Sequence, residues 1–223
     1  MLKALIALGG KEVREDQISD ALWPEADGDV AHESFATNLH RLRKLLGNEK
    51  ALQLREGRLT LDERFCWVDA WAFERILGQA DVRWEEKSKE NAVRLVEKAM
   101  DLYKGPFLFR EIEQPWAAAM SERLRNKFLR SVGRLGQYWQ EAGQWGKALD
   151  CYQKGLEVET LAEEFYQGLM ICHQHLGQRA EALSVYNRCK RALSQAFGVG
   201  PSAKTESIFQ LILNRGNGES GKR

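Results

Sequence analysis

The chain has 223 residues, which is too long for one small hydrophobic core and fits one large domain or two of ordinary size. An apolar fraction of 43% with 29% charged residues is typical of a folded globular protein and excludes a disordered or membrane-embedded chain. No stretch approaches about 18 uninterrupted apolar residues, and the N-terminus lacks the order of an export signal, so we expect a cytoplasmic protein without membrane contacts.

The formal net charge of +1 hides an uneven distribution along the chain. Residues 1–77 contain 11 Lys and Arg against 14 Asp and Glu, a net charge of −3. That balance argues against nucleic acid, because non-specific DNA affinity comes from cations that meet phosphates. Residues 40–64, however, contain seven Lys and Arg against four acidic residues, so the positive charge is local.

Three helical patterns open the chain. Residues 2–8 are amphipathic and end at a glycine pair, and a second helix over 14–23 is stopped by Pro24. A longer helix is predicted from about Val30 to Leu46, with Asp29 as its N-cap.

The third predicted helix has two distinct faces at 100° per residue. Its apolar side comprises Ala31, Phe35, Leu39, Leu42 and Leu46. Its polar side comprises Glu33, Thr37, His40, Arg41 and Lys44, flanked by Ser34 and Asn38. We therefore expect one face in the core and a polar, partly basic face outside.

Residues 52–61 predict a β-hairpin, because apolar residues alternate on both sides of the turn pair Glu56-Gly57. The predicted pairs are Leu52 with Leu61, Gln53 with Thr60, Leu54 with Leu59, and Arg55 with Arg58. All four leucines then share one face, and Gln53, Arg55, Arg58 and Thr60 share the other.

Three helices followed by a hairpin is the order of a winged helix, whose third helix enters a major groove while the hairpin touches the neighbouring backbone. The segments Asp20–Pro24, His40–Gly47 and Leu54–Leu59 resemble the response-regulator type of winged helix, and more closely that of the antibiotic regulatory activators of actinomycetes. That family begins with a small antiparallel sheet, whereas Met1 opens directly on a helix. We therefore expect a piece of a longer protein, with a wing that lacks its usual strand partners.

A second composition shift begins at Cys66. Residues 66–77 predict a helix capped by Asp69 with inward-facing aromatics, and together with 99–108 they resemble the bacterial transcriptional activator domain. Residues 191–212 resemble the end of the same domain.

Internal repetition is the strongest signal in the chain. Four residues recur with a displacement of 34: Gly143, Ala148, Leu149 and Tyr152 return as Gly177, Ala182, Leu183 and Tyr186. This period is that of tetratricopeptide repeats, in which small residues let paired helices approach and an aromatic ring fills the gap.

The expected fold is mainly α, with a truncated winged helix of three helices plus a β-hairpin followed by a tetratricopeptide-like helical-repeat domain. We place the winged-helix DNA-binding domain at 1–64, the activator-type repeat domain at 65–215 and a flexible tail at 216–223.

The candidate DNA contacts lie on the third helix and on the wing. They are Ser34, Thr37, Asn38, His40, Arg41, Lys44, Arg55 and Arg58. Arg41 is the first choice, because a guanidinium group can bind guanine bidentately, whereas arginines at a hairpin tip more often neutralise phosphate. The alternative is that both surfaces are simply solvated.

Catalysis, cofactors and metals are not expected. No phosphate loop, nucleophile elbow or paired-carboxylate pattern is present, and Cys172, His173 and His175 point in different directions on a helix. The four cysteines are expected to be free thiols, three of them in helical patterns. Packing roles are assigned to all seven tryptophans: Trp23, Trp67, Trp71, Trp84, Trp116, Trp139 and Trp145.

These patterns together predict a transcription regulator, most simply an activator, that binds double-stranded DNA. The family resemblance implies that the repeat domain contacts RNA polymerase or another protein and supports a homodimer. Two alternatives stay open. One is a protein-interaction module without DNA affinity, which the net −3 favours; the other is a regulatory arm of a larger signalling ATPase or sensor.

Overall fold

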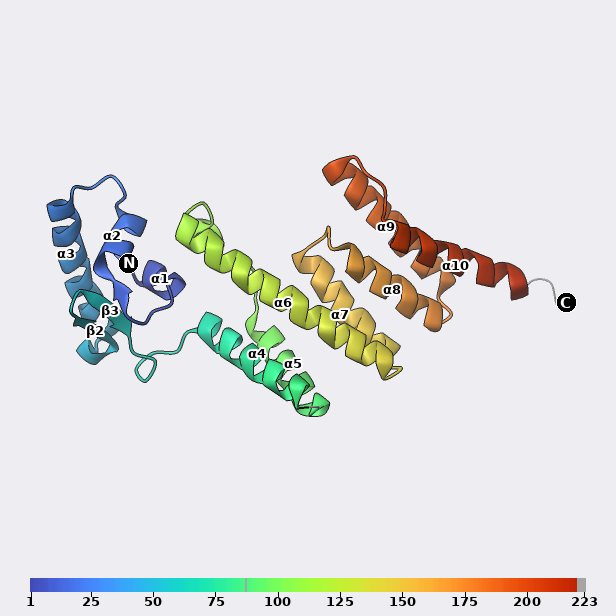
Figure 1. Cartoon of the computed structure of the whole chain (residues 1–223), viewed down its shortest axis with the longest axis horizontal. Helices are drawn as coiled ribbons and strands as arrows, with labels where there is room; N and C mark the ends of the chain where they lie inside the picture. Colours follow the sequence, from blue (N-terminus) through green and yellow to red (C-terminus); the bar gives the residue numbers. More distant parts are fainter. Residues whose placement is uncertain (87, 220–223) are drawn as a thin grey trace. The chain divides into compact units, whose positions relative to one another are not determined.

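The computed structural model describes residues 1–86 and 88–219 (Figure 1). These residues form two compact units, the first from 1–76 and 101–125 and the second from 77–100 and 126 onward. These units are defined by how densely their residues pack, whereas the predicted boundary after residue 64 divides the DNA-binding part from the repeat part. The functional boundary therefore stays a prediction. Within the described residues no helix is both long enough and apolar enough to cross a membrane.

The N-terminal part of the first unit has the expected three helices and hairpin, with one additional strand. Its elements are α1 (Leu2–Ala7), β1 (Val13–Arg14), α2 (Glu15–Leu22), α3 (Gly28–Leu46), the short 3-10 helix η1 (Glu49–Ala51), β2 (Leu52–Arg55) and β3 (Arg58–Leu61). Helix α3 begins earlier than predicted, and its N-cap is Asp27 instead of Asp29. Gly47, at φ 65°, ends it in the left-handed conformation.

The hairpin has the predicted register, from Leu52 opposite Leu61 to Arg55 opposite Arg58. It is not isolated, because β1 pairs antiparallel with β3 and makes a three-stranded sheet in the order β1-β3-β2. The expectation that the wing lacks strand partners is therefore wrong. Two residues with only one apolar position, Val13, carry too little alternation to be seen in the sequence.

One hydrophobic cluster holds the winged helix together. Its buried members are Leu5, Val13, Ile18, Phe35, Leu39, Leu52, Leu59 and Leu61. The apolar face of α3 therefore packs as predicted, with Leu42 and Leu46 half-buried at its edge. Leu54 is the exception among the four wing leucines: it is 38% exposed, and it lies on the edge strand β2, whereas its partner Leu59 lies on the central strand β3 and is fully buried.

One of the seven tryptophans lies in the linker after the wing, and the packing role expected for it is wrong. Trp67 is 68% exposed and therefore has no core role. Helix α4 (Asp69–Glu85) follows, and its Trp71 does pack against the winged-helix cluster. Val68, whose carbonyl accepts from the amide of Ala72, precedes the helix, so Asp69 lies in the first turn instead of at the cap.

The remaining helices follow in chain order. They are α5 (Lys89–Leu102), the 3-10 helix η2 (Phe109–Glu111), α6 (Pro115–Glu141), α7 (Trp145–Val158), α8 (Glu163–His175), α9 (Arg179–Phe197) and α10 (Ala203–Glu219). Helix α10 continues past Gly216, where the tail was expected to begin, and residues 220–223 lie outside the described part of the chain.

The second unit confirms the tetratricopeptide-like repeat. Ala148 and Ala182 are fully buried, and the repeat-related tyrosines Tyr152 and Tyr186 are each 6% exposed. Gly143 and Gly177, at φ 70° and 72°, make the turns before α7 and α9. Residues that are 34 positions apart thus occupy equivalent buried or turn positions in successive repeats.

Glycine brings the repeat helices close around one ring. A Cβ atom on Gly136 of α6 would lie 2.6 Å from the Tyr152 ring, and one on Gly168 of α8 would lie 2.5 Å from it. Tyr152 itself comes from α7, so its ring is wedged between two glycines on the flanking helices. This is the packing that the repeat signature predicts, with the glycines identified by the structure.

Candidate nucleic-acid interface

The polar side of α3 is open to solvent. Thr37, His40, Arg41 and Lys44 are all exposed, and Arg41 and Lys44 lie in the last two turns of the helix. Cations are favourable there, because the helix C-terminus carries partial negative charge. The four side chains therefore present a partly cationic surface backed by the buried face of Ala31, Phe35 and Leu39, which fixes the helix orientation.

Ser34 and Asn38 are placed differently from these four residues. Both are half-buried, and the Asn38 side-chain amide donates a hydrogen bond of 2.8 Å to the Ser34 carbonyl oxygen. Part of the hydrogen-bonding capacity of Asn38 is thus satisfied within its own helix. The two residues lie at the edge of the exposed face, as predicted, and not at its centre.

Arg43 supports this surface from behind, which the sequence reasoning missed. Its guanidinium group donates two hydrogen bonds, of 3.2 and 3.1 Å, to the carbonyl oxygen of Leu52 at the start of β2. The last turn of α3 is thereby fastened to the wing. In the sequence Arg43 is one member of a basic run, and only its position on the helical wheel, away from Arg41, separates the two roles.

The wing presents its two arginines at a tight turn. Glu56 and Gly57 have φ of 49° and 69°, the pair of positive values that a type I′ hairpin requires. Arg55 and Arg58 stand directly opposite each other on either side of this turn, and both are exposed. An Arg58 guanidinium nitrogen lies 3.4 Å from the Glu12 carbonyl oxygen, next to β1.

An exposed leucine lies beside the basic residues of α3. Leu45 is 83% exposed, the largest fraction among the exposed large apolar side chains that the structure describes. It follows Arg41 by four residues and therefore lies on the same side of the helix. The helical wheel contains this signal, but the sequence reasoning had not used it.

The histidine and cysteine residues of α8 do not converge. Cys172 is fully buried, His173 bonds the Gln178 side chain at 2.8 Å, and the His175 ring stacks on Trp145 with centroids 3.8 Å apart. Across residues 1–86 and 88–219 no group of three potential ligands gathers around a common point. Three cysteines, Cys151, Cys172 and Cys189, are buried, and burial raises the pKa of each thiol.

The fold and this surface define a class: a winged helix joined to tetratricopeptide-like helical repeats. The model of the bacterial transcriptional activator domain matches residues 68–213, and the chain belongs to this family.

Curated relatives are regulators from Streptomyces. The chain is 25% identical over 213 residues to the regulatory protein AfsR of Streptomyces griseus, covering 96% of this chain and 22% of that protein. It is 27% identical over 226 residues to the transcriptional regulator RedD of Streptomyces coelicolor, covering 95% of this chain and 63% of that one. The chain thus spans about a fifth of the AfsR length and less than two thirds of RedD.

A solved structure shares the fold. It is Mycobacterium tuberculosis EmbR in complex with a low-affinity phosphopeptide, with a TM-score of 0.75, 19% identity, and coverage of 96% of this chain and 58% of that one. The curated relatives are thus a regulatory protein and a transcriptional regulator, and the likeness to EmbR extends over the winged helix and the repeats together.

Proposed function

We propose that this chain binds double-stranded DNA through α3 and the wing, and that it does so as part of a transcriptional activator. The observation that carries the proposal is the exposed face of α3 that contains Arg41. The opposite face of this helix packs on the core, and Arg43 bonds its last turn to β2. A surface of this kind is preorganised for a groove.

The proposal assigns either base recognition or phosphate binding to each of these cations. Arg41 reads a guanine edge in the major groove, and Lys44 neutralises a phosphate at the groove wall. Arg55 and Arg58 meet the phosphate backbone beside the groove, where their hairpin tip reaches it. Leu45 contacts a thymine methyl group, which is the apolar feature that a major groove displays.

The repeat unit contacts a protein in this proposal, either RNA polymerase or a second copy of the chain. Stacked helical repeats form extended surfaces that suit such contacts. Membership of the activator domain family supports a partner in transcription, and the protein acts in the cytoplasm, where promoters and polymerase are found.

A titration with DNA tests the main proposal. A duplex selected from a random pool is measured by fluorescence anisotropy across a series of salt concentrations, with Arg41→Ala and the matched control Arg94→Ala. Arg94 is an exposed arginine on α5, away from α3 and the wing in the sequence. We expect Arg41→Ala to lose at least about tenfold in affinity while Arg94→Ala keeps the original value.

The salt series separates phosphate neutralisation from base recognition. Removal of a phosphate-binding cation in Arg55→Ala reduces the slope of log affinity against log salt by about one, whereas removal of a base-reading side chain lowers affinity with little change in slope. Unchanged affinity and slope in Arg41→Ala would reject the assignment of α3 as the reading helix.

The second candidate is a protein-interaction module without DNA affinity. The net charge of −3 over residues 1–77 favours it, because so acidic a segment attracts phosphates weakly. In the same titration it predicts no binding of the original chain to any duplex, even at low salt.

A further inference from the structure

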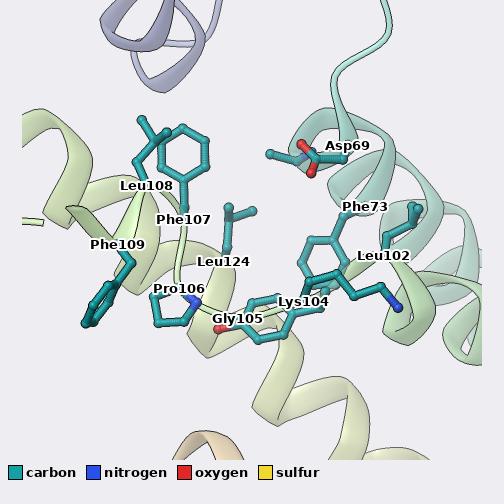
Figure 2. A pocket seen from close by; sticks show the side chains of 12 residues that line it. Asp69, Phe73, Leu102, Lys104, Gly105, Pro106, Phe107, Leu108, Phe109 and Leu124 are labelled. Carbon is teal, nitrogen blue, oxygen red and sulfur yellow. The ribbon is translucent and has the colours of Figure 1, made fainter. Parts of the chain in front are cut away.

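A pocket of about 360 Å³ lies in the first unit, between the first turn of α4, the segment that follows α5, and α6 (Figure 2). The volume lies in the range of small-molecule sites. Its walls are mostly apolar and aromatic, with Phe73 of α4 and Leu102 on one side and Phe107, Leu108 and Leu124 on the other.

One carboxylate stands at the rim of this apolar pocket. Asp69 Oδ1 accepts the backbone N–H of Ala70 at 2.7 Å, and among the described residues no cationic side chain pairs with the group. Lys104 also lines the pocket, but Figure 2 shows its ammonium group pointing away from the Phe107 side. The free acceptor is thus Asp69, above the ring of Phe73.

The wall formed by the segment after α5 is held in an unusual backbone conformation. Gly105 has φ of 132°, and Leu108 has φ of 47°, a left-handed value that a leucine rarely adopts. The Tyr103 ring packs on Phe73 with centroids 5.7 Å apart, which joins this segment to α4. Such strain persists only where surrounding packing enforces it, and it is concentrated at binding sites.

Both walls of the pocket are tied to α1 of the winged helix. On the α4 side, the indole N–H of Trp71 donates to the Ile6 carbonyl oxygen at 3.3 Å. On the other side, Glu111 of η2 pairs with Lys3. A molecule that contacts both walls is therefore linked to α1 twice, through the hydrogen bond of Trp71 and through the ion pair of Glu111.

We infer that this pocket binds a small amine with an aromatic or branched hydrocarbon body. The hydrocarbon body fills the space between Phe73 and Phe107, and the ammonium group pairs with the Asp69 carboxylate. The faces of the aromatic rings add to this preference, because they carry negative potential and attract cations. An anionic ligand meets the Asp69 charge at the rim and binds more weakly.

Three indole compounds that differ in charge provide the first test: tryptamine, indole and indole-3-acetate. Each is titrated into the full chain by calorimetry, with Asp69→Asn as the test variant and Asp150→Asn, an exposed position on α7, as the matched control. Asparagine keeps the shape of Asp69 and its bond to Ala70. We expect tryptamine to bind at least about tenfold more tightly than indole-3-acetate, and Asp69→Asn to remove that difference while Asp150→Asn keeps it.

Heteronuclear NMR locates the bound probe without relying on a variant. Tryptamine is expected to shift the amide signals of Ala70, Tyr103 and Gly105 and to leave that of Ala182 in the repeat unit unchanged. Equal binding of all three probes, an unaltered preference in Asp69→Asn, or signal shifts confined to other residues would each overturn the inference.

The consequence for DNA rests on the proposed function and has its own readout. If the proposed function is correct, saturating tryptamine changes the affinity of the chain for its selected duplex, and Asp69→Asn abolishes the change. The calorimetric and NMR results do not involve DNA, so failure of the pocket and failure of DNA binding are distinguished.

Discussion

Replacing Gly168 by alanine tests the close approach of the repeat helices. The new Cβ atom would lie 2.5 Å from the Tyr152 ring, well inside van der Waals contact. The ring cannot move away, because Gly136 is similarly close on its other side: a Cβ atom there would also lie within contact distance, 2.6 Å from the ring. Overpacking of this kind costs about 1–3 kcal/mol, and the confinement from both sides places it near the upper end.

Helix propensity opposes this loss and must be subtracted. Alanine is better than glycine in a helix interior by about 1 kcal/mol, so the net destabilisation expected for Gly168→Ala is about 2 kcal/mol. Gly78→Ala is the matched control, since Gly78 lies inside α4 and, apart from the backbone of its own helix, no atom lies within 4 Å of the position of its Cβ. That variant should be more stable than the original chain by up to about 1 kcal/mol.

Urea unfolding followed by far-ultraviolet circular dichroism measures both free energies of unfolding. A further variant, Tyr152→Leu, removes the ring, and in that background Gly168→Ala should no longer destabilise the chain, because only the gain in helix propensity remains. The reasoning fails if Gly168→Ala is as stable as the original chain, or if its cost is the same with and without the Tyr152 ring.

Three further substitutions test other parts of the fold. Burial raises the pKa of Glu163, but hydrogen bonds from Thr205 and Ser202 outweigh this effect and leave the pKa below its usual value. The ionised carboxylate therefore stabilises the fold at pH values above its unfolded-state pKa. This contribution disappears as the pH falls through the folded-state pKa. Glu163→Gln should accordingly be less stable at neutral pH and show a flatter stability profile in acid, measured by thermal melting. Gly57→Ala should cost about 1–2 kcal/mol, because alanine must adopt a left-handed conformation at φ 69°, and amide exchange in the wing should accelerate. Trp71→Phe keeps most of the packing but loses the hydrogen bond to Ile6, so a loss of about 1 kcal/mol in urea unfolding is expected; an unchanged midpoint would show that this bond contributes nothing.

Periodic features were predictable from the sequence because each depends on local geometry. The register of the wing followed from alternation around Glu56-Gly57, and every predicted pair is present. The core face of α3 followed from 3.6-residue periodicity, and its buried members Ala31, Phe35 and Leu39 were among those predicted. The 34-residue repeat located equivalent buried positions without any structure.

Features that depend on distant partners were not predictable. Strand β1 exists because β3 is available to pair with it, and Val13-Arg14 alone shows no strand pattern. The Arg43 tether requires the Leu52 carbonyl to be in place, and the exposed position of Trp67 depends on how the linker leaves the sheet. Exposure of the α3 surface and of the wing supports the eight candidate contacts to different degrees, and their role in binding stays a prediction.

The discontinuous first unit has a consequence for work with fragments. A fragment cut after residue 64 loses Trp71, whose ring fills the space beside Gly10, and also Glu111, the ion-pair partner of Lys3. Since 101–125 belong to the same compact body as 1–76, every cut before residue 125 removes part of that body, and a cut after residue 125 keeps 77–100 attached to it. Poor expression or lost DNA affinity in a shortened version would therefore reflect the loss of these stabilising contacts. Deletion mapping would then assign operator recognition to a segment that only stabilises the fold.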